Sequence, residues 1–186
     1  MFEEILSIIG VSLKKHNIPY MIIGGQAVLL YGEPRLTRDI DVALGVNANH
    51  IDELLTVVHD LSLKPMPEDI KSFVMQTMVL PALDETTGIR VDFIFSFTPY
   101  ETEAIKREKI EILNQEVYFA SPEDIIIHKI FAGRPRDLED ARTIILKNPD
   151  IDAKYIRDWL KEFDAASDTE DFLKTFEEIL NKGKLQ

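Results

Sequence analysis

The stretch IIGGQAVLLYGEPRLTRDIDV, residues 22–42, decides the fold of this chain. It opens with an apolar run that predicts a short buried strand, and this run ends on two adjacent glycines, Gly24 and Gly25. It closes with two aspartates, Asp39 and Asp41, on either side of one isoleucine. Glycine lets an anion approach the backbone closely, and paired carboxylates suit divalent metal ions. The stretch therefore predicts a strand-to-helix turn beside a pair of metal-binding carboxylates.

Side-chain alternation places the two aspartates on the same face of the next predicted strand, Ile40–Leu44. Successive side chains of a strand point to opposite faces, so Ile40 and Val42 share one face while Asp39 and Asp41 share the other. The first face is apolar and suits a core. The second face holds two neighbouring carboxylates, which can converge on metal ions spaced about 3.5–4 Å apart.

A third aspartate, Asp92, lies inside another predicted strand, over residues 89–95. Val91 and Phe93 belong to the apolar face of that strand, so Asp92 points the other way, together with Arg90. A carboxylate in a buried-looking strand is costly unless it is hydrogen-bonded, ion-paired or bound to a metal. Two interpretations stay open: Asp92 pairs with Arg90 or another arginine, or it joins the earlier aspartates as a ligand of Mg²⁺ or Mn²⁺, which prefer oxygen ligands.

The glycine pair supplies the other half of the predicted site. A strand that ends in Gly24-Gly25 and opens a helix leaves backbone N–H groups free at the helix N-terminus, which is an anion-binding arrangement. For the glycines alone, an ordinary tight turn between strand and helix is the alternative. Neither G-x-G-x-x-G nor G-x-x-x-x-G-K-[ST] occurs in the sequence, so the Rossmann and P-loop fingerprints are excluded.

Length and composition are those of an ordinary globular protein. The 186 residues, 45% of them hydrophobic and 29% charged, suit one domain or one domain with a helical appendage. The absence of cysteine excludes disulfides, thiolate zinc sites and cysteine nucleophiles. The net charge of −12 disfavours nucleic acid as a partner. An acidic, amphipathic N-terminus and the lack of a long apolar run predict a cytoplasmic protein with no membrane contact.

The pattern of elements changes from mixed to helical near Ser121, which is a good N-cap before Pro122. This predicts a mixed α/β core over residues 1–120 and a C-terminal helical region over residues 121–186. The predicted helices cover residues 3–15, 26–31, 49–61, 99–108, 122–132, 137–147, 153–164 and 169–182. The predicted strands cover residues 20–23, 40–44, 77–80, 89–95, 110–113 and 117–120, with a loop at 65–67 and hairpin turns at 84–88 and 114–115.

Four charged residues outside the aspartate set need their own interpretation. Lys129 falls inside the apolar arc of the helix from Pro122, so its ammonium group needs an anion or must reach past the core to solvent. Asp137 and Asp140 fit the N-cap and N3 positions of the next helix. Arg35 fits a surface charge in the loop that precedes the paired aspartates.

The order Gly24-Gly25, a spacer of thirteen residues, then Asp39–Asp41 resembles the signature of the DNA polymerase beta-type nucleotidyltransferase superfamily. That signature is a hydrophobic residue, a glycine, a glycine or serine, a spacer, and an Asp-hydrophobic-Asp element. Taken alone, the element is moderately specific. It gains weight from a third carboxylate, which Asp92 in Val-Asp-Phe matches, and from Lys129.

Further segments resemble the small bacterial branch of this superfamily, which includes AbiEii-like proteins and minimal nucleotidyltransferases of toxin–antitoxin and abortive-infection systems. Arg35–Asp39 is one such segment, and Ser121–Asp124 followed by Gly133–Asp137 is another. The similarity extends over about residues 20–142.

The resemblance implies an α/β (α+β) nucleotidyltransferase fold, with a small mixed β-sheet flanked by helices and a C-terminal helical region. It implies that Asp39 and Asp41 hold Mg²⁺ or Mn²⁺ on the triphosphate of an NTP such as ATP. Asp92 would bind metal and act as the base toward the attacking hydroxyl, so that NMP is transferred and pyrophosphate released. The nucleotide contacts implied in the same way are Gly24, Gly25, Thr37, Arg38 and Lys129.

The acceptor is not specified by the sequence. By family analogy it is a protein side chain, for example on a partner toxin, or a small molecule such as an aminoglycoside. Many members carry serine where this chain has Gly25, so a catalytically weak or inactive nucleotide- or partner-binding module of the same fold is the main alternative. An Asp-x-Asp glycosyltransferase also uses metal and nucleotide, but it accounts less well for Gly24-Gly25 and Lys129.

Overall fold

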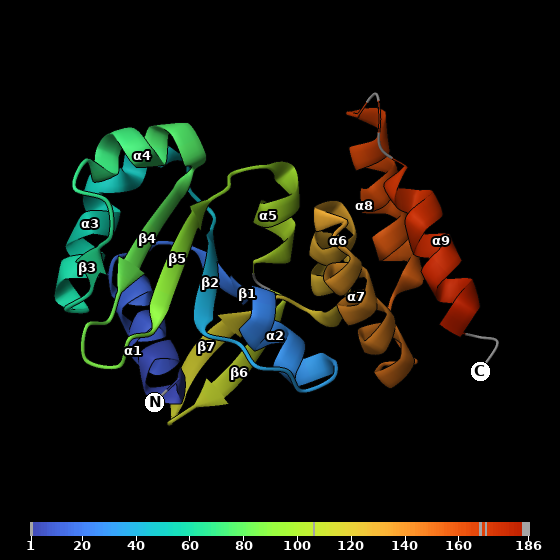
Figure 1. Cartoon of the computed structure of the whole chain (residues 1–186), viewed down its shortest axis with the longest axis horizontal. Helices are drawn as coiled ribbons and strands as arrows, with labels where there is room; N and C mark the ends of the chain where they lie inside the picture. Colours follow the sequence, from blue (N-terminus) through green and yellow to red (C-terminus); the bar gives the residue numbers. More distant parts are fainter. Residues whose placement is uncertain (1, 106, 168, 170, 184–186) are drawn as a thin grey trace. The chain divides into compact units, whose positions relative to one another are not determined.

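The computed structural model forms two compact units (Figure 1). The first unit comprises residues 1–26 and 36–120, and the second comprises residues 27–35 and 121–186. The residues that the structure describes are 2–105, 107–167, 169 and 171–183. The sequence-based division at residues 120 and 121, read as two folding domains, stays a prediction.

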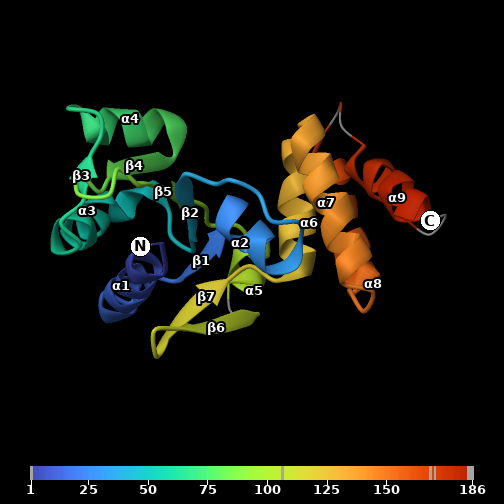
Figure 2. The same ribbon diagram turned by 60° about the horizontal axis from the view of Figure 1, so that its bottom comes forward.

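A seven-stranded mixed sheet forms the first unit, in the order β3-β4-β5-β2-β1-β7-β6. Its strands are β1 (Tyr20–Ile23), β2 (Asp39–Leu44), β3 (Lys64–Pro65), β4 (Val79–Leu83), β5 (Arg90–Phe95), β6 (Glu108–Ile112) and β7 (Gln115–Phe119). The middle strand β2 pairs in parallel with β5 and antiparallel with β1. The predicted hairpins are confirmed as β4–β5 and as β6–β7, which is seen at the sheet edge in Figure 2.

Alternation of apolar side chains explains the central strands. Ile40 and Val42 of β2, and Val91 and Phe93 of β5, are completely buried. These are β-branched and aromatic side chains, which fit a pleated surface with one packed face. The first unit therefore has the mixed α/β architecture that the sequence predicts, with a sheet whose central strands carry the aspartates.

Four helices and one 3-10 turn accompany the sheet in the first unit. They are α1 (Phe2–Lys15), α3 (Ile51–Asp60), α4 (Ile70–Thr77), α5 (Pro99–Ala104) and η1 (Ala48–His50). Helix α1 packs against β7 and buries Ile5, Ile9 and Leu13, which recur at helical spacing on one face. Helix α2 (Gly24–Tyr31) begins in the first unit and continues in the second.

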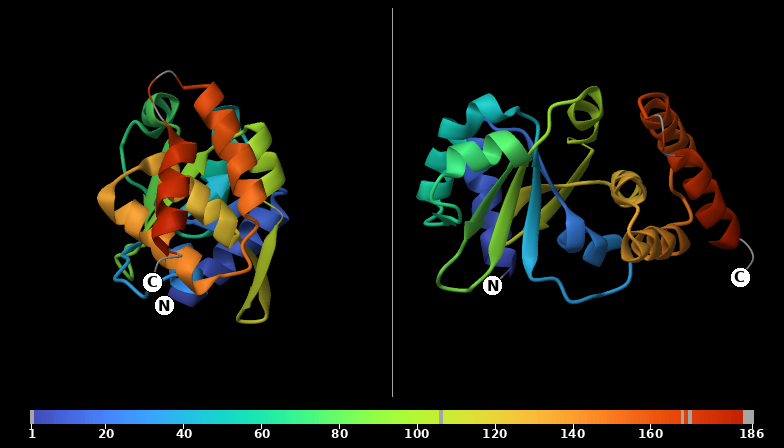
Figure 3. Two further views of the ribbon diagram at one scale, coloured as in Figure 1. Left: turned by 90° about the vertical axis from the view of Figure 1, so that its right-hand side faces the viewer. Right: turned by 45° about the horizontal axis from the view of Figure 1, so that its top comes forward.

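Helices make up the second unit: α6 (Pro122–Ala132), α7 (Pro135–Lys147), α8 (Ala153–Ala165) and α9 (Phe172–Gly183). Ser121 is the N-cap of α6, as predicted, and its Oγ accepts a hydrogen bond from the Asp124 backbone N–H at 3.2 Å. Helices α8 and α9 lie side by side (Figure 3). Their shared core contains Ile156, Leu160 and Phe176, all completely buried.

The short segment 27–35 is fastened to helix α7 within the second unit. Asn148 Nδ2 donates to the Tyr31 carbonyl at 2.9 Å, and Lys147 Nζ donates to the Gly32 carbonyl at 3.1 Å. Lys147 also pairs with Glu33 at 2.9 Å. These contacts tie the end of α2 to a helix that follows it by about a hundred residues in the chain.

Several element boundaries predicted from the sequence are wrong. The helix predicted over 99–108 ends at Ala104, and Glu108 belongs to β6; residue 106 lies outside the described residues. The helix predicted over 169–182 begins at Phe172, and residue 170 lies outside the described residues. Helix α7 begins at Pro135 with Arg134 as its N-cap, so Asp137 is not an N-cap. Proline suits the first helical position because its missing N–H is not needed there.

Two elements were missed altogether. The predicted loop at 65–67 overlaps the short edge strand β3 at Pro65, where a proline is tolerated because no ladder hydrogen bond is lost on the outer side. Helix α4 has apolar residues at helical spacing, Ile70, Phe73 and Val74, but this pattern covers a single short stretch and only Val74 is buried. A second local signal is Asp69, whose side chain caps the helix by accepting from the Ser72 backbone N–H at 3.3 Å.

Within the described part of the chain, no helix is both long enough and apolar enough to cross a membrane.

Candidate functional site

Strand β2 displays Asp39 and Asp41 on one face and buries the residues that alternate with them. Ile40 and Val42 have no exposed surface, whereas the two aspartates are partly exposed. The side-chain alternation predicted from the sequence is confirmed. Because β2 is paired on both sides, by β1 and by β5, the backbone that carries the two carboxylates is fixed.

Strand β5 brings the third carboxylate to the same face. In the parallel pairing of β2 with β5, Asp41 stands opposite Asp92, and Asp39 stands opposite Arg90. Register partners point to the same side of a sheet, on strands about 4.8 Å apart. The three predicted aspartates and one guanidinium group therefore occupy four adjacent positions on two neighbouring strands.

Gly24 follows β1 directly and lies against Asp41. Its backbone is left-handed, with a φ of +63°, and a Cβ built on it would overlap the Asp41 carboxylate. Only glycine meets both demands, since it adopts positive φ without strain and has no side chain to displace the neighbour. The first of the two glycines is thus explained by the aspartate beside it, and Gly25 is buried in the first turn of α2.

The loop before β2 holds Asp39 in place through its side chain and its backbone. Thr37 Oγ1 donates to Asp39 Oδ1 at 3.1 Å and to the Asp39 carbonyl at 3.3 Å. Gln26 Nε2 donates to the same carbonyl at 3.5 Å. Arg38 is exposed in this loop. Thr37 therefore orients a carboxylate, a role that the sequence did not assign to it.

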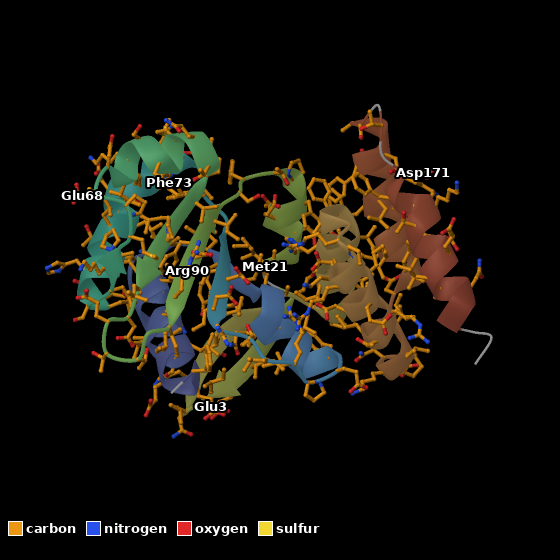
Figure 4. The ribbon with its side chains drawn as sticks, viewed as in Figure 1. Glu3, Met21, Glu68, Phe73, Arg90 and Asp171 are labelled. Carbon is orange, nitrogen blue, oxygen red and sulfur yellow. The ribbon has the colours of Figure 1, made fainter. Side chains whose placement is uncertain are left out.

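Arg90 makes an ion pair with Asp92 on the face that carries the three aspartates. Arg90 Nε donates to Asp92 Oδ1 at 2.7 Å. The Asp92 side chain is 15% exposed and that of Arg90 is 49% exposed. Figure 4 labels Arg90 on strand β5. One of the two interpretations left open by the sequence, an ion pair between these residues, is therefore found.

The donor chemistry of this face fits a hard divalent cation, because Asp39, Asp41 and Asp92 offer only carboxylate oxygens. Within the described residues, however, no group of three or more His, Cys, Asp or Glu side chains is arranged to hold a metal ion. The bond from Arg90 is a physical reason for this difference. It engages one of the two oxygens of Asp92 with a guanidinium group.

Lys129 belongs to the second unit, where it is buried on α6 and meets two carboxylates of α7. Its Nζ lies 2.7 Å from Asp137 Oδ1 and 3.0 Å from Asp140 Oδ2. Arg134 Nε also donates to Asp137 Oδ2, at 2.5 Å. The anions that a buried lysine requires are thus present in the protein itself.

The electrostatics of Asp137 reflect these neighbours. Burial raises the pKa of its carboxyl group, but hydrogen bonds from Lys129 and Arg134, together with their charges, outweigh this and lower the pKa below its ordinary value. Asp137 is therefore held in its charged form.

Arg35 is not the surface charge that the sequence predicted. Its side chain is only 22% exposed, and its guanidinium group pairs with Asp140 Oδ2 at 3.4 Å. The arginine and aspartate are far apart in sequence, so the pairing depends on tertiary structure. No local pattern would have found it. Gln26 was likewise given no role by the sequence, whereas Arg90 was named as a possible partner of Asp92 from the face that they share.

Comparison with known proteins gives a family and a fold. Residues 1–181 match the sequence model of a family described as "Nucleotidyltransferase of unknown function (DUF6036)". No curated protein sequence matches this chain.

Solved structures similar to this chain include the antibiotic-resistance factor ANT(2'')-Ia, whose solution structure has 20% sequence identity and a TM-score of 0.57. The likeness covers 88% of this chain and 93% of that chain. A crystal structure of ANT(2'')-Ia with adenylyl-2''-tobramycin has 20% identity and a TM-score of 0.56, over 88% and 97% of the two chains. An antigenic nucleotidyltransferase-like protein from Paracoccidioides brasiliensis has 20% identity and a TM-score of 0.57, over 93% and 92%. At this identity the likeness establishes the fold.

Proposed function

Since the chain belongs to this family of nucleotidyltransferases of unknown function, we propose that it transfers a nucleoside monophosphate from an NTP to a hydroxyl group. The observation that carries the proposal is the register of β2 and β5, which sets Asp41 opposite Asp92 with Asp39 on the same face. The acceptor oxygen forms a bond to the α-phosphorus, the bond from this phosphorus to the bridging oxygen breaks, and pyrophosphate leaves.

Each aspartate has a distinct part in this proposal. Asp39 and Asp41 would hold Mg²⁺ or Mn²⁺, which would neutralise charge on the triphosphate. Asp92 would complete the ligand set and accept the proton of the attacking hydroxyl. Its low exposure favours a defined orientation toward that hydroxyl. Thr37 supports the set indirectly, because its hydroxyl fixes one oxygen of Asp39.

The nucleotide phosphates would lie at the start of α2. Gly24 and Gly25 open this helix, whose first backbone N–H groups have no partner within the helix. Arg38 is exposed in the loop before β2 and would supply positive charge. Lys129 enters the proposal only through the family resemblance, because Asp137 and Asp140 already meet its charge.

The acceptor would be a protein side chain or a small molecule. A partner protein is the first candidate, which would fit an AbiEii-like enzyme of a toxin–antitoxin system in the cytoplasm. A small molecule is the second, because the similar ANT(2'')-Ia was solved with adenylyl-2''-tobramycin. Nucleic acid is disfavoured by the net charge of −12.

Calorimetry of nucleotide binding tests the proposal. ATP, GTP, CTP and UTP would be titrated with and without Mg²⁺ into wild type and into the double variant Asp39→Asn/Asp41→Asn. We expect one or more NTPs to bind wild type only with metal, and the double variant to lose binding at least tenfold. The control is Asp52→Asn/Glu53→Gln, in the exposed first turn of α3. It also removes two negative charges, and it should leave nucleotide binding unchanged.

A non-catalytic binding module is the second candidate, and the ion pair of Arg90 with Asp92 favours it, because Asp92 is occupied there. The two candidates differ in whether pyrophosphate is released. A binding module would give metal-dependent NTP binding with no pyrophosphate and no mass increase on any acceptor. Absence of NTP binding to the folded wild type would rule out both nucleotide proposals.

A further inference from the structure

Arg90 is the one cationic group among the four adjacent positions on β2 and β5. It stands opposite Asp39 in the register, two residues before Asp92 on its own strand. Its partner Asp92 in turn stands opposite Asp41. Every neighbour of Arg90 within this set is therefore an aspartate.

Three carboxylates on one patch repel one another unless positive charge is present. The 2.7 Å bond from Arg90 Nε to Asp92 Oδ1 supplies one such charge. A hydrogen bond between charged groups is stronger than one between neutral groups. The aspartate patch is therefore partly neutralised by the chain itself.

We propose that Arg90 is a resident counterion of the aspartate site, which competes with a divalent cation for Asp92 and so weakens metal binding. This inference rests on the proposed function only in taking the three aspartates as the metal site. A cation on Asp92 and the Arg90 guanidinium would repel each other, and Arg90 already occupies a lone pair of Asp92 Oδ1 and withdraws charge from the carboxylate. Metal binding is therefore weakened while Arg90 stays in place, and it is strengthened when Arg90 moves away.

The difference in exposure identifies the partner that moves. Asp92 is only 15% exposed and sits in the central part of the sheet, whereas Arg90 is 49% exposed on a long, flexible side chain. Arg90 can leave by rotating toward solvent without disturbing the backbone. Displacement then costs the charged hydrogen bond but no unfolding.

An exposed ion pair of the same length provides the comparison. Lys64 Nζ lies 2.7 Å from Glu85 Oε1, with both side chains more than half exposed. Lys64 lies on the edge strand β3, where its register partner is Leu83, and β3 is three strands away from β2 in the sheet. Its removal changes the net charge as much as the removal of Arg90, but leaves the aspartate patch intact.

The test measures binding of Mn²⁺ alone, without nucleotide, from the loss of the free-ion electron paramagnetic resonance signal. Arg90→Gln is expected to bind Mn²⁺ about tenfold more tightly than wild type, the effect of one charged hydrogen bond. Lys64→Gln is expected to bind as wild type does. Arg90→Lys keeps the charge but loses the fixed donor, and should fall between. Thermal melting would verify that each variant is folded.

The gain must belong to the aspartate site, and not to other acidic groups of this acidic chain. In an Asp41→Asn background, Arg90→Gln should therefore give no tightening. An equal or weaker Mn²⁺ affinity in Arg90→Gln, or a gain that persists without Asp41, would overturn the counterion role.

Failure of this inference is separable from failure of the proposed function. If wild type transfers nucleotide but Arg90→Gln does not bind Mn²⁺ more tightly, Arg90 is a structural partner and the enzyme proposal stands. If Arg90→Gln binds Mn²⁺ more tightly through Asp41 but no nucleotide is bound, the counterion stands and the enzyme proposal fails.

Discussion

Gly24 lies so close to Asp41 that the three atoms nearest to a Cβ built on it all belong to that one side chain. Gly24→Ala would therefore do two things: force alanine into a left-handed backbone and displace the carboxylate. We expect a loss of unfolding free energy of about 2–4 kcal/mol, from strain and overlap together. Urea denaturation measures this loss, and metal-dependent nucleotide binding should fall with it.

Gly88 provides the control for backbone strain alone. It has a similar φ of +73°, but no atom lies within 4 Å of a Cβ built on it. Gly88→Ala should cost about 1–2 kcal/mol and leave nucleotide binding unchanged. Equal losses for the two variants would mean that the contact of Gly24 with Asp41 contributes nothing.

Ionisation of Tyr20 is expected to lower the free energy of unfolding in alkali. Burial raises the pKa of its hydroxyl from 10.0 to about 12, although a hydrogen bond from the Tyr118 backbone N–H partly offsets this. The unfolded chain therefore loses the Tyr20 proton first as pH rises. The contribution to stability is complete below pH 10 and is lost, by up to about 2–3 kcal/mol, as pH approaches 12.

Tyr20→Phe should abolish this part of the pH dependence. Unfolding curves between pH 9 and 12, with tyrosinate absorbance recorded in parallel, compare the variant with wild type. A late-titrating tyrosine that survives in Tyr20→Phe would contradict the assignment.

Removal of the Lys129 ammonium group is expected to lower the free energy of unfolding strongly. Lys129→Met would leave Asp137 and Asp140 buried beside each other without their shared cation, and we expect a cost of about 3–5 kcal/mol. Adding Asp140→Asn to this variant should recover part of the loss, because the repulsion between the two neighbouring carboxylates is removed. If the double variant is as unstable as the sum of the single ones, the three groups are not coupled.

Protonation of Asp137 is expected to lower the free energy of unfolding in acid. Its pKa in the folded state lies below the ordinary value of 3.8, because bonds from Lys129 and Arg134 outweigh burial. The stabilisation is complete above the ordinary pKa and disappears as pH falls through the lowered one. Asp137→Asn should therefore show a smaller decline in unfolding free energy between pH 5 and pH 2 than wild type. An unchanged slope would indicate that other carboxylates dominate.

The sequence predicted the aspartate face because the information there is local. Strand alternation alone places Asp39 and Asp41 together, and the same rule places Asp92 away from the core of its own strand. The pairing of β2 with β5 was only a condition in that prediction, and the structure supplies it. Gly24 precedes the site because its position requires a positive φ and leaves no room for a side chain beside the Asp41 carboxylate.

The other features of the fold and the site depend on tertiary contacts, which no local sequence pattern reveals. Lys129 was expected to need an anion, but Asp137 and Asp140 could be identified only once α6 and α7 were packed together. Arg35 pairs with Asp140, which is far from it in the sequence. Helix α4 was missed because its eight residues carry only a short apolar pattern, Ile70, Phe73 and Val74.

The division of the chain has a consequence for its synthesis and for cutting it. Residues 27–35 leave the ribosome early, yet they belong with helices encoded at the far end, to which Tyr31, Gly32 and Arg35 are bonded. Until residues 121–186 emerge, the buried Ala27 and Val28 have no complete surroundings. We therefore expect the nascent N-terminal part to expose apolar surface until the chain is complete. A fragment that stops at Ala120 should aggregate, and co-expression with residues 121–186 should rescue it.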